Sequence, residues 1–352
     1  MHISQKTPDI RGFFVYFEYY LSLKINEYPI VKRIAVLTSG GDAPGMNACI
    51  RAVVRAGVHF DLEIFGIHGG YQGLIENNIT PMDASSVANI IQYGGTILKT
   101  ARSKDFMTPE GRLKAFNNLK ALNIEGLVCI GGNGTYTGAM IFEKEFGIPS
   151  VGCPGTIDND LFGTDYTIGY DTAINTAVEA IDKIRDTADA HNRVFFIEVM
   201  GRHSGHIALY AGIAGGAEGI FIPEKEHEFE DIVKIYEKKS RTKQFSIFVV
   251  AEGDEDGHAF DVAKKFQEKF PNTDSRVTVL GHIQRGGKPS ANDRILASRL
   301  GAHAVKALLE GQRNVAVGVI ANDIAFTSFE DAIYNKKDIN EKLWVMNDII
   351  TR

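Results

Sequence analysis

The sequence predicts an α/β protein made of two units, each built on a parallel, doubly wound sheet. Three observations lead to this prediction. Short runs rich in β-branched and aromatic residues alternate with amphipathic or alanine-rich segments. These runs are too numerous for one ordinary sheet. Glycines also gather at the carboxyl ends of many runs, where parallel sheets bind their ligands.

The predicted elements follow one another from residue 31 onward. Strands are expected at residues 34–37, 62–67, 126–130, 150–152, 194–200, 219–222, 245–251, 277–280 and 315–320. Helices are expected at residues 46–58, 108–122, 135–146, 172–187 and 292–309. Because helical segments separate many of the strands, the connections suit parallel pairing. No low-complexity linker marks the boundary between the two units.

The charge balance gives no sign of a nucleic-acid or membrane partner. Of the 352 residues, 38 are Lys or Arg and 44 are Asp or Glu, which leaves a net charge of −6. The three cysteines, Cys49, Cys129 and Cys153, lie in separate apolar stretches without the spacing of a metal site. We therefore expect buried free thiols and a cytoplasmic protein.

Residues 1–30 differ from the rest of the chain. Residues 13–23 are aromatic and apolar, but Glu18 interrupts them, and they are shorter than the ~20 residues that span a bilayer. No small-residue cleavage site follows, so a signal peptide is not expected either. The segment is interpreted as a peripheral extension, with a docking segment as the alternative. Deleting it distinguishes the two, because only a docking segment is needed for assembly.

Two glycine motifs have the strand–glycine–helix order of an anion site. Residues 38–47 contain Gly41, and residues 130–135 contain Gly132, Gly134 and Thr135. Bare backbone amides at such a turn bind phosphate, although neither motif has the Walker or dinucleotide pattern. Any one glycine pair is equally explained by a tight turn. Seven clusters at strand ends, accompanied by Arg and Asp, favour a phosphate-binding crevice.

Two carboxylates follow the strand predicted at residues 150–152. Asp158 and Asp160 are separated by one residue, so one can accept a proton while the other meets a metal ion. An Asx-rich turn that caps the next helix explains the same pattern.

Arginines flank other strand ends. Arg202, Arg276 and Arg285 suit a phosphorylated substrate, because the guanidinium fork matches two phosphate oxygens. His282, in the same motif as Arg285, is either a ligand or a structural histidine. His203 and His206 are interpreted as structural, since no third metal ligand accompanies them.

In this order, the motifs resemble the bacterial ATP-dependent 6-phosphofructokinase family. The similarity covers about residues 31–350 and includes residues 293–298. It implies two Rossmann-like parallel-sheet domains with the active site in the cleft between them. The ATP-binding domain would comprise residues 31–169 plus about 284–334. The fructose 6-phosphate-binding domain would comprise about 170–283 plus 335–352, with residues 1–30 outside the similarity.

The resemblance also implies an activity, which is phosphorylation of fructose 6-phosphate on its 1-hydroxyl in glycolysis. Asp158 matches the catalytic base, Thr156 contacts the reacting groups, and Arg202 lies beside the transferring phosphoryl group. Asp160 and Asn133 match the Mg²⁺ site, although the family usually has Asp in place of Asn133. The ATP-site matches are Gly41, Tyr71, Arg102, Ser103, Gly132, Asn133, Gly134 and Thr135.

The matches to the sugar site are Thr156, Asp158, Arg193, Met200, Gly201, Arg202, Glu224, Arg276, His282 and Arg285. Among them, Arg193 and Arg276 match a pair that reaches across a subunit boundary to the 6-phosphate, which implies a homotetramer with shared sites. An effector site for ADP or phosphoenolpyruvate is implied between subunits, at Arg51, Arg55, Arg185, Glu218, Arg241 and Lys243. Asn78 stands where the family usually has Arg, and Phe245 where it often has His, so a weakened effector response is expected.

Two other functions remain open at the level of sequence. A pyrophosphate-dependent phosphofructokinase would have Asp in place of Gly134 and Lys in place of Gly155, so the two glycines favour ATP. A sugar-phosphate- or nucleotide-binding regulator without catalysis is the other alternative. The intact set of Thr156, Asp158, Asp160 and Arg202 argues against it.

Overall fold

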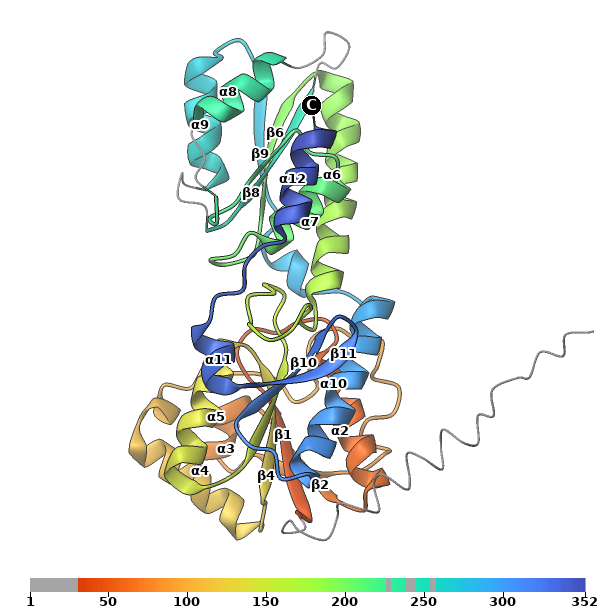
Figure 1. Cartoon of the computed structure of the whole chain (residues 1–352), viewed down its shortest axis with the longest axis vertical. Coiled ribbons are helices and arrows are strands. Elements are labelled where there is room, and N and C mark those ends of the chain that lie inside the picture. Colours follow the sequence, from red (N-terminus) through yellow and green to blue (C-terminus); the bar gives the residue numbers. More distant parts are fainter. Residues whose placement is uncertain (1–30, 226–228, 239–244, 254–257, 352) are drawn as a thin grey trace, which may run out of the picture.

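A computed structural model describes residues 31–225, 229–238, 245–253 and 258–351. It has two lobes, one above the other along the long axis of the molecule (Figure 1). Each lobe has its own sheet with helices packed on it, so the predicted α/β fold with two sheets is confirmed. The predictions for residues 1–30, Arg241 and Lys243 lie outside the described residues.

The lower lobe in Figure 1 contains a seven-stranded sheet in the order β11-β10-β5-β4-β1-β2-β3. Its strands are β1 (Arg33–Thr38), β2 (Glu63–Ile67), β3 (Ile79–Met82), β4 (Gly126–Gly131), β5 (Ser150–Pro154), β10 (Val315–Ile320) and β11 (Asp323–Ser328). The five inner strands are parallel, whereas β3 and β11 pair antiparallel at the two edges. The sequence analysis missed both edge strands, because they are half-exposed and lack a continuous apolar run.

The upper lobe contains a four-stranded, wholly parallel sheet in the order β7-β8-β6-β9. Its strands are β6 (Val194–Val199), β7 (Gly219–Phe221), β8 (Ser246–Ala251) and β9 (Ser275–Val279). All nine predicted strands of the chain are therefore observed, with small changes at their ends.

The five predicted helices are also present. They are α2 (Met46–His59), α4 (Pro109–Ala121), α5 (Asn133–Phe146), α6 (Tyr170–His191) and α10 (Ala291–Leu309). The described residues form further helices: α3 (Gly70–Ile75), α7 (His206–Ala214), α8 (Phe229–Lys238), α9 (Ala259–Lys269), α11 (Phe329–Tyr334) and α12 (Glu341–Ile350). Short 3-10 turns lie at Asp105–Met107 (η1) and Gly281–Arg285 (η2). Within the described residues, no helix combines the length and apolarity needed to cross a membrane.

Both faces of each sheet are buried. In β1, Ile34 and Val36 belong to one apolar core, and Ala35 and Leu37 belong to the core on the opposite face. Continuous burial of this kind is why the inner strands are near-continuous apolar runs, as expected for parallel sheets covered by helices. The first of these cores continues along α6 into the upper lobe, so the two lobes share apolar packing.

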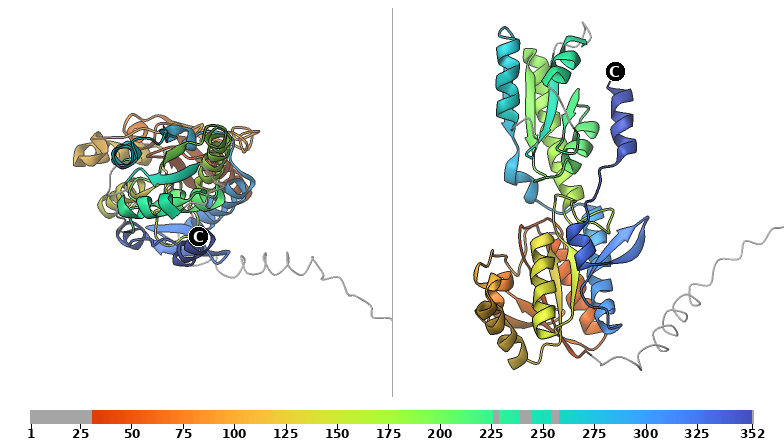
Figure 2. Two further views of the ribbon diagram at one scale, coloured as in Figure 1. Left: turned by 90° about the horizontal axis from the view of Figure 1, so that it is seen from above. Right: turned by 60° about the vertical axis from the view of Figure 1, so that its left-hand side comes forward.

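Three parts of the chain join the lobes. The long helix α6 begins beside the lower lobe and runs along the upper one, and the segments before α10 and between α11 and α12 also cross (Figures 1 and 2). Asp293, in the first turn of α10, accepts hydrogen bonds from the Gly169 and Thr172 amides, both at 2.8 Å. This carboxylate therefore caps the N-terminus of α6 and fixes it to α10.

Candidate active site

The two carboxylates predicted for catalysis lie on a loop that follows β5. The Asp158 amide donates to Thr156 Oγ1 at 3.2 Å. Asn159, between the two carboxylates, has a left-handed backbone with φ 54°, which asparagine tolerates better than most residues. The alternative interpretation, in which this segment caps the next helix, is wrong in this structure, because Asp293 caps α6.

The upper lobe brings the ends of β6 and β8 to this loop. The Arg202 amide donates to the Glu252 carboxylate at 2.7 Å, and Arg202 itself has φ 59°. Ser204 Oγ donates to the Asp158 carbonyl at 2.8 Å and so ties the two lobes together at the site. Arg202 thus lies at the junction of the lobes and is exposed to solvent, and its place beside the phosphoryl group stays a prediction.

The surroundings of Asp158 make its carboxylate more basic than that of an ordinary aspartate. Burial and the negative charge of Asp160 raise the pKa of Asp158 to about 6, and Glu252 adds to the rise. Arg285 and Arg202 oppose it with positive charge. Burial also raises the pKa of Asp160. A carboxylate whose pKa lies near neutral pH is suited to accept a proton at physiological pH.

Glu252 was missed by the sequence analysis. It follows β8 directly, at the same edge of the upper sheet as Arg202 follows β6. Its position immediately after a buried strand is the signal that would have found it, by the same reasoning that selected Asp158.

The glycine loop after β1 approaches the arginine of η2. A side chain at Gly41 would place its Cβ only 2.8 Å from Arg285 Nη1, so a larger residue would displace the guanidinium. Arg285 Nε is buried and finds no hydrogen-bond partner among the described residues. Arg285 therefore reaches both the Gly41 turn and the surroundings of Asp158, with donor capacity left for an anionic ligand.

The second glycine loop opens α5. Gly132 is its N-cap, whereas Thr135 is buried and donates from Oγ1 to the Ser39 carbonyl at 3.1 Å. Thr135, although a residue type common at N-caps, therefore does not cap α5. Tyr71 is buried as well, and its hydroxyl donates to the Thr135 carbonyl at 2.6 Å. The hydrogen bonds of Thr135 and Tyr71 thus hold the loop in place. Contact of either side chain with a nucleotide stays a prediction.

Two buried side-chain oxygens lack a hydrogen-bond donor. Asn133 Oδ1 and Asp158 Oδ1 find no hydrogen-bond partner among the described residues. Buried acceptors of this kind suit a hard cation or a ligand hydroxyl. Within the part of the chain that the structure describes, no three His, Cys, Asp or Glu side chains gather into a closed metal cage.

The remaining predicted ligands of this junction differ in availability. Arg102 and His282 are exposed, while Met200 and Gly201 are buried at the end of β6. Ser103 Oγ donates to Gln72 at 2.7 Å, and both oxygens of Glu224 accept from the Gly205 amide at 2.9 and 3.0 Å. The Glu224 carboxylate is thus engaged in holding the loop before α7, and its contact with a sugar stays a prediction.

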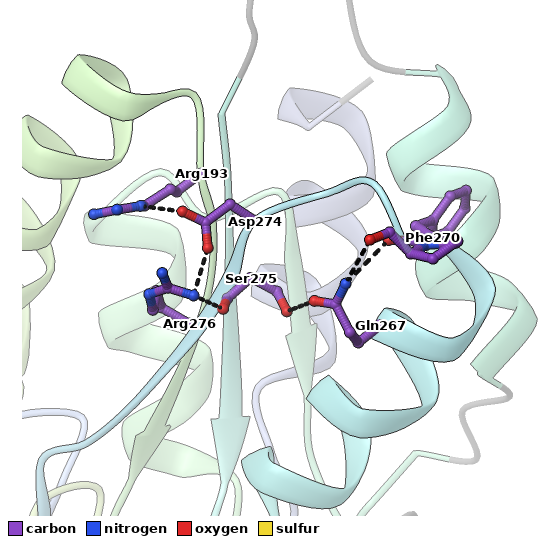
Figure 3. Close-up of polar contacts among 7 residues, drawn as sticks. Arg193, Gln267, Phe270, Asp274, Ser275 and Arg276 are labelled. Carbon is purple, nitrogen blue, oxygen red and sulfur yellow. Dashed lines mark hydrogen bonds and ion pairs between the residues drawn. The ribbon is translucent and has the colours of Figure 1, made fainter.

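Arg193 and Arg276 lie together, but at the other end of the upper sheet. Asp274 forms ion pairs with both, at 2.6 Å from Arg193 Nε (Figure 3). Arg193 precedes β6 and Arg202 follows it, so at about 3.3 Å per residue roughly 20 Å separates them. The sequence grouped Arg276 with Arg202 and Arg285, and within one chain the structure does not bring them together.

The described effector candidates are also divided between the lobes. Arg51 and Arg55 lie on α2 of the lower lobe, while Arg185 and Glu218 lie in the upper lobe. Arg185 donates to the carbonyls of Gly215 and Gly216, and its guanidinium stands 5.7 Å from the centre of the Phe245 ring. Glu218 accepts from the Ile247 amide at 2.5 Å.

Comparison with known proteins decides the family. The phosphofructokinase family model matches residues 33–308. The chain belongs to this family. It is 57% identical over 314 residues to the ATP-dependent 6-phosphofructokinase of Cytophaga hutchinsonii, covering 89% of this chain and 96% of that protein. It is 55% identical over 321 residues to ATP-dependent 6-phosphofructokinase 1 of Thermus thermophilus, covering 91% and 99%.

Solved phosphofructokinase structures share the fold. The phosphofructokinase of Saccharomyces cerevisiae superposes with a TM-score of 0.83 at 37% identity, over 91% of this chain and 46% of that one. A pyrophosphate-dependent phosphofructokinase from Marinobacter aquaeolei superposes with a TM-score of 0.77 over 89% and 86%. Its identity is only 21%, so it supports the fold alone.

Proposed function

We propose that this phosphofructokinase is an ATP-dependent 6-phosphofructokinase, which converts fructose 6-phosphate to fructose 1,6-bisphosphate in the cytoplasm. The observation that carries the proposal is the meeting of Asp158 and Asp160 with Arg202 and Arg285 at the junction of the lobes. The curated relatives above, which share more than half of their residues with this chain, are named for the same activity.

The side chains of the junction supply the two requirements of phosphoryl transfer, which are positioning and positive charge. The 1-hydroxyl oxygen of the sugar attacks the γ-phosphorus of ATP, the bond to the β-phosphate oxygen breaks, and Asp158 accepts the hydroxyl proton. Arg202 and Arg285 stabilise the negative charge on the phosphoryl oxygens. Arg102, exposed on the nucleotide side, adds a further charge. Thr156 fixes the Asp158 loop through its hydroxyl.

The donor set at this junction fits Mg²⁺. Asp160 and Asn133 would hold it together with nucleotide phosphates, because magnesium keeps several waters and needs few protein carboxylates. The buried, unpartnered Asn133 Oδ1 supports this assignment. When bound, the ion supplies positive charge beside the transferring phosphoryl group. Asn in place of Asp removes a charge, so we expect an active kinase with a weaker protein contribution to magnesium binding.

Two glycines favour ATP over pyrophosphate. A Cβ at Gly134 would meet no heavy atom of the described residues within 4 Å, so this side of the loop is open to a larger donor. At Gly155 the Cβ would lie 3.0 Å from both Ile130 Cγ2 and Met46 Cε, so a longer residue there needs its neighbours to move. Glycine therefore suits the close packing at 155 and leaves room at 134.

The separation of Arg193 and Arg276 from Asp158 supports a homotetramer with shared sites. At roughly 20 Å from Arg202, the pair cannot meet the sugar bound at the same chain's junction, which leaves the site of a neighbouring subunit as the one it would serve. Arg51 and Arg55 lie in a different lobe from Arg185. This separation likewise supports an effector site between subunits for ADP or phosphoenolpyruvate. Phe245 and Asn78 would make that site weak.

A coupled assay tests the function. Fructose 6-phosphate is supplied with ATP or with pyrophosphate over a magnesium series, and fructose 1,6-bisphosphate formation is followed. Turnover with ATP and not with pyrophosphate is expected. Turnover with pyrophosphate alone would establish the pyrophosphate-dependent enzyme. No turnover with either donor, together with retained ligand binding, would establish a regulator.

A further inference from the structure

Asn159 is the centre of the loop that carries Asp158 and Asp160. Its side chain is 3% exposed, and its Oδ1 accepts from the Thr167 amide at 3.0 Å. Its Nδ2 donates to the Asp165 carbonyl at 3.2 Å. These bonds hold Asn159 in the left-handed backbone conformation, with φ 54°. The orientation of both flanking carboxylates therefore depends on how firmly Asn159 is held.

A lysine far along the chain completes this arrangement. Lys337 Nζ donates to Asn159 Oδ1 at 2.8 Å and to the Asp165 carbonyl at 2.9 Å. Both acceptors already take part in the Asn159 turn, so one ammonium group holds its two ends. Burial lowers the pKa of Lys337 to about 7, while the Asp165 and Asp160 carboxylates favour the charged form.

Lys337 also lies where the chain passes between the lobes. It belongs to the segment that joins α11, beside the lower sheet, to α12, which contacts α7 of the upper lobe (Figure 2). Burial lowers the pKa of His206, the first residue of α7, to about 4, and the nearby Lys337 charge lowers it further. The segment thus reaches the catalytic loop and the start of α7 at once.

The environment of Lys337 is unusual for a lysine side chain. Lys337 is half-buried, and removing an ammonium group from water is costly unless strong acceptors hold it. Its neighbour Lys336 is exposed, as lysines usually are. Lys337 stands outside residues 33–308, the part matched by the family model.

We propose that Lys337 is a positioning residue for the phosphoryl transfer, which acts through Asn159 to keep Asp158 and Asp160 directed at the reacting groups. The role rests on the proposed function, because it concerns the orientation of the same base and metal ligand. The segment that joins α11 to α12 would then contribute to catalysis together with the loop that follows β5.

The test compares Lys337→Met with Lys336→Met in the full-length protein. Lys336→Met is the matched control, since it makes the same substitution at an exposed lysine one residue away. For Lys337→Met we expect kcat to fall about 10- to 100-fold, as for other residues that orient catalytic groups, with KM for ATP and the sugar within about threefold. Lys336→Met should stay within about twofold of the unmutated enzyme.

Amide hydrogen exchange provides a readout that is independent of turnover. Residues 156–167 should exchange about tenfold faster or more in Lys337→Met, while β1 and β4 keep their protection. If Lys337→Met does not fold, Lys337→Gln is judged by the same criteria.

Three results would overturn the proposal. The first is a folded Lys337→Met with kcat within about twofold of the unmutated enzyme, and the second is an equal fall in Lys336→Met. The third is exchange that rises equally in β1 and β4, which would show a general loss of stability. If the unmutated protein has no phosphotransferase activity, the proposed function fails separately. Unchanged exchange at residues 156–167 would then overturn the role of Lys337.

Discussion

The pKa of Asp158 should be visible in the pH profile of the enzyme. With this pKa at about 6, the base is about 90% ionised at pH 7 and about 9% ionised at pH 5. Because only the ionised form accepts a proton, kcat/KM should fall about tenfold between these pH values. An ordinary aspartate with a pKa near 3.9 would stay almost fully ionised, and the fall would be below about 10%.

Substrate phosphates also titrate near pH 6, so the profile of one enzyme does not identify the group. Glu252→Gln separates the two causes. Its negative charge raises the pKa of Asp158, so its removal lowers that pKa and moves the acid limb to lower pH. The substrate phosphates are unchanged by the substitution. Each profile is normalised to its own plateau, because Glu252 also accepts the Arg202 amide.

The assay is a series of kcat/KM measurements from pH 5 to pH 8 for the unmutated enzyme, Glu252→Gln and Glu237→Gln. Glu237 lies exposed on α8, at the far end of the upper lobe, and controls for the change in net charge. Only Glu252→Gln should retain a larger share of its plateau activity at pH 5. Identical acid limbs in all three enzymes would refute the role of Asp158 as the titrating base.

Three further predictions follow from the same contacts. Asp158→Asn should lower kcat about 10²- to 10⁴-fold in steady-state assays while calorimetry shows near-normal sugar binding; near-normal turnover would contradict the assignment. Asn133→Asp should leave the reaction unchanged and alter its magnesium dependence, which a metal titration measures; an unchanged titration would count against a metal role for residue 133. Asp293→Ala should cost about 2 kcal/mol or more in denaturant unfolding, because it leaves the α6 amides uncapped, whereas Asp293→Asn, which keeps an acceptor, should cost less. Equal losses in both would contradict the capping role.

The inner strands were predictable because their signal is local. A strand buried on both faces must be apolar throughout, so the run in β1 identifies itself without knowledge of its neighbours. The edge strands β3 and β11 are half-exposed and carry no such run, and β3 contains Pro81. Their pairing depends on a neighbouring strand that a short stretch of sequence does not specify.

The sequence by itself determined the fold class, the family and the motifs that hold Asp158, Asp160 and Arg202, because glycine, acid and arginine cluster at strand ends that a parallel sheet brings to one edge. Only the tertiary structure decided which distant groups act on them. Glu252 and Lys337 reach the Asp158 loop from other elements, whereas Arg193 and Arg276 lie at the opposite end of the upper sheet, paired with Asp274. Charge and hydrogen bonding act over a few ångströms of space, and separation along the chain does not reveal that distance.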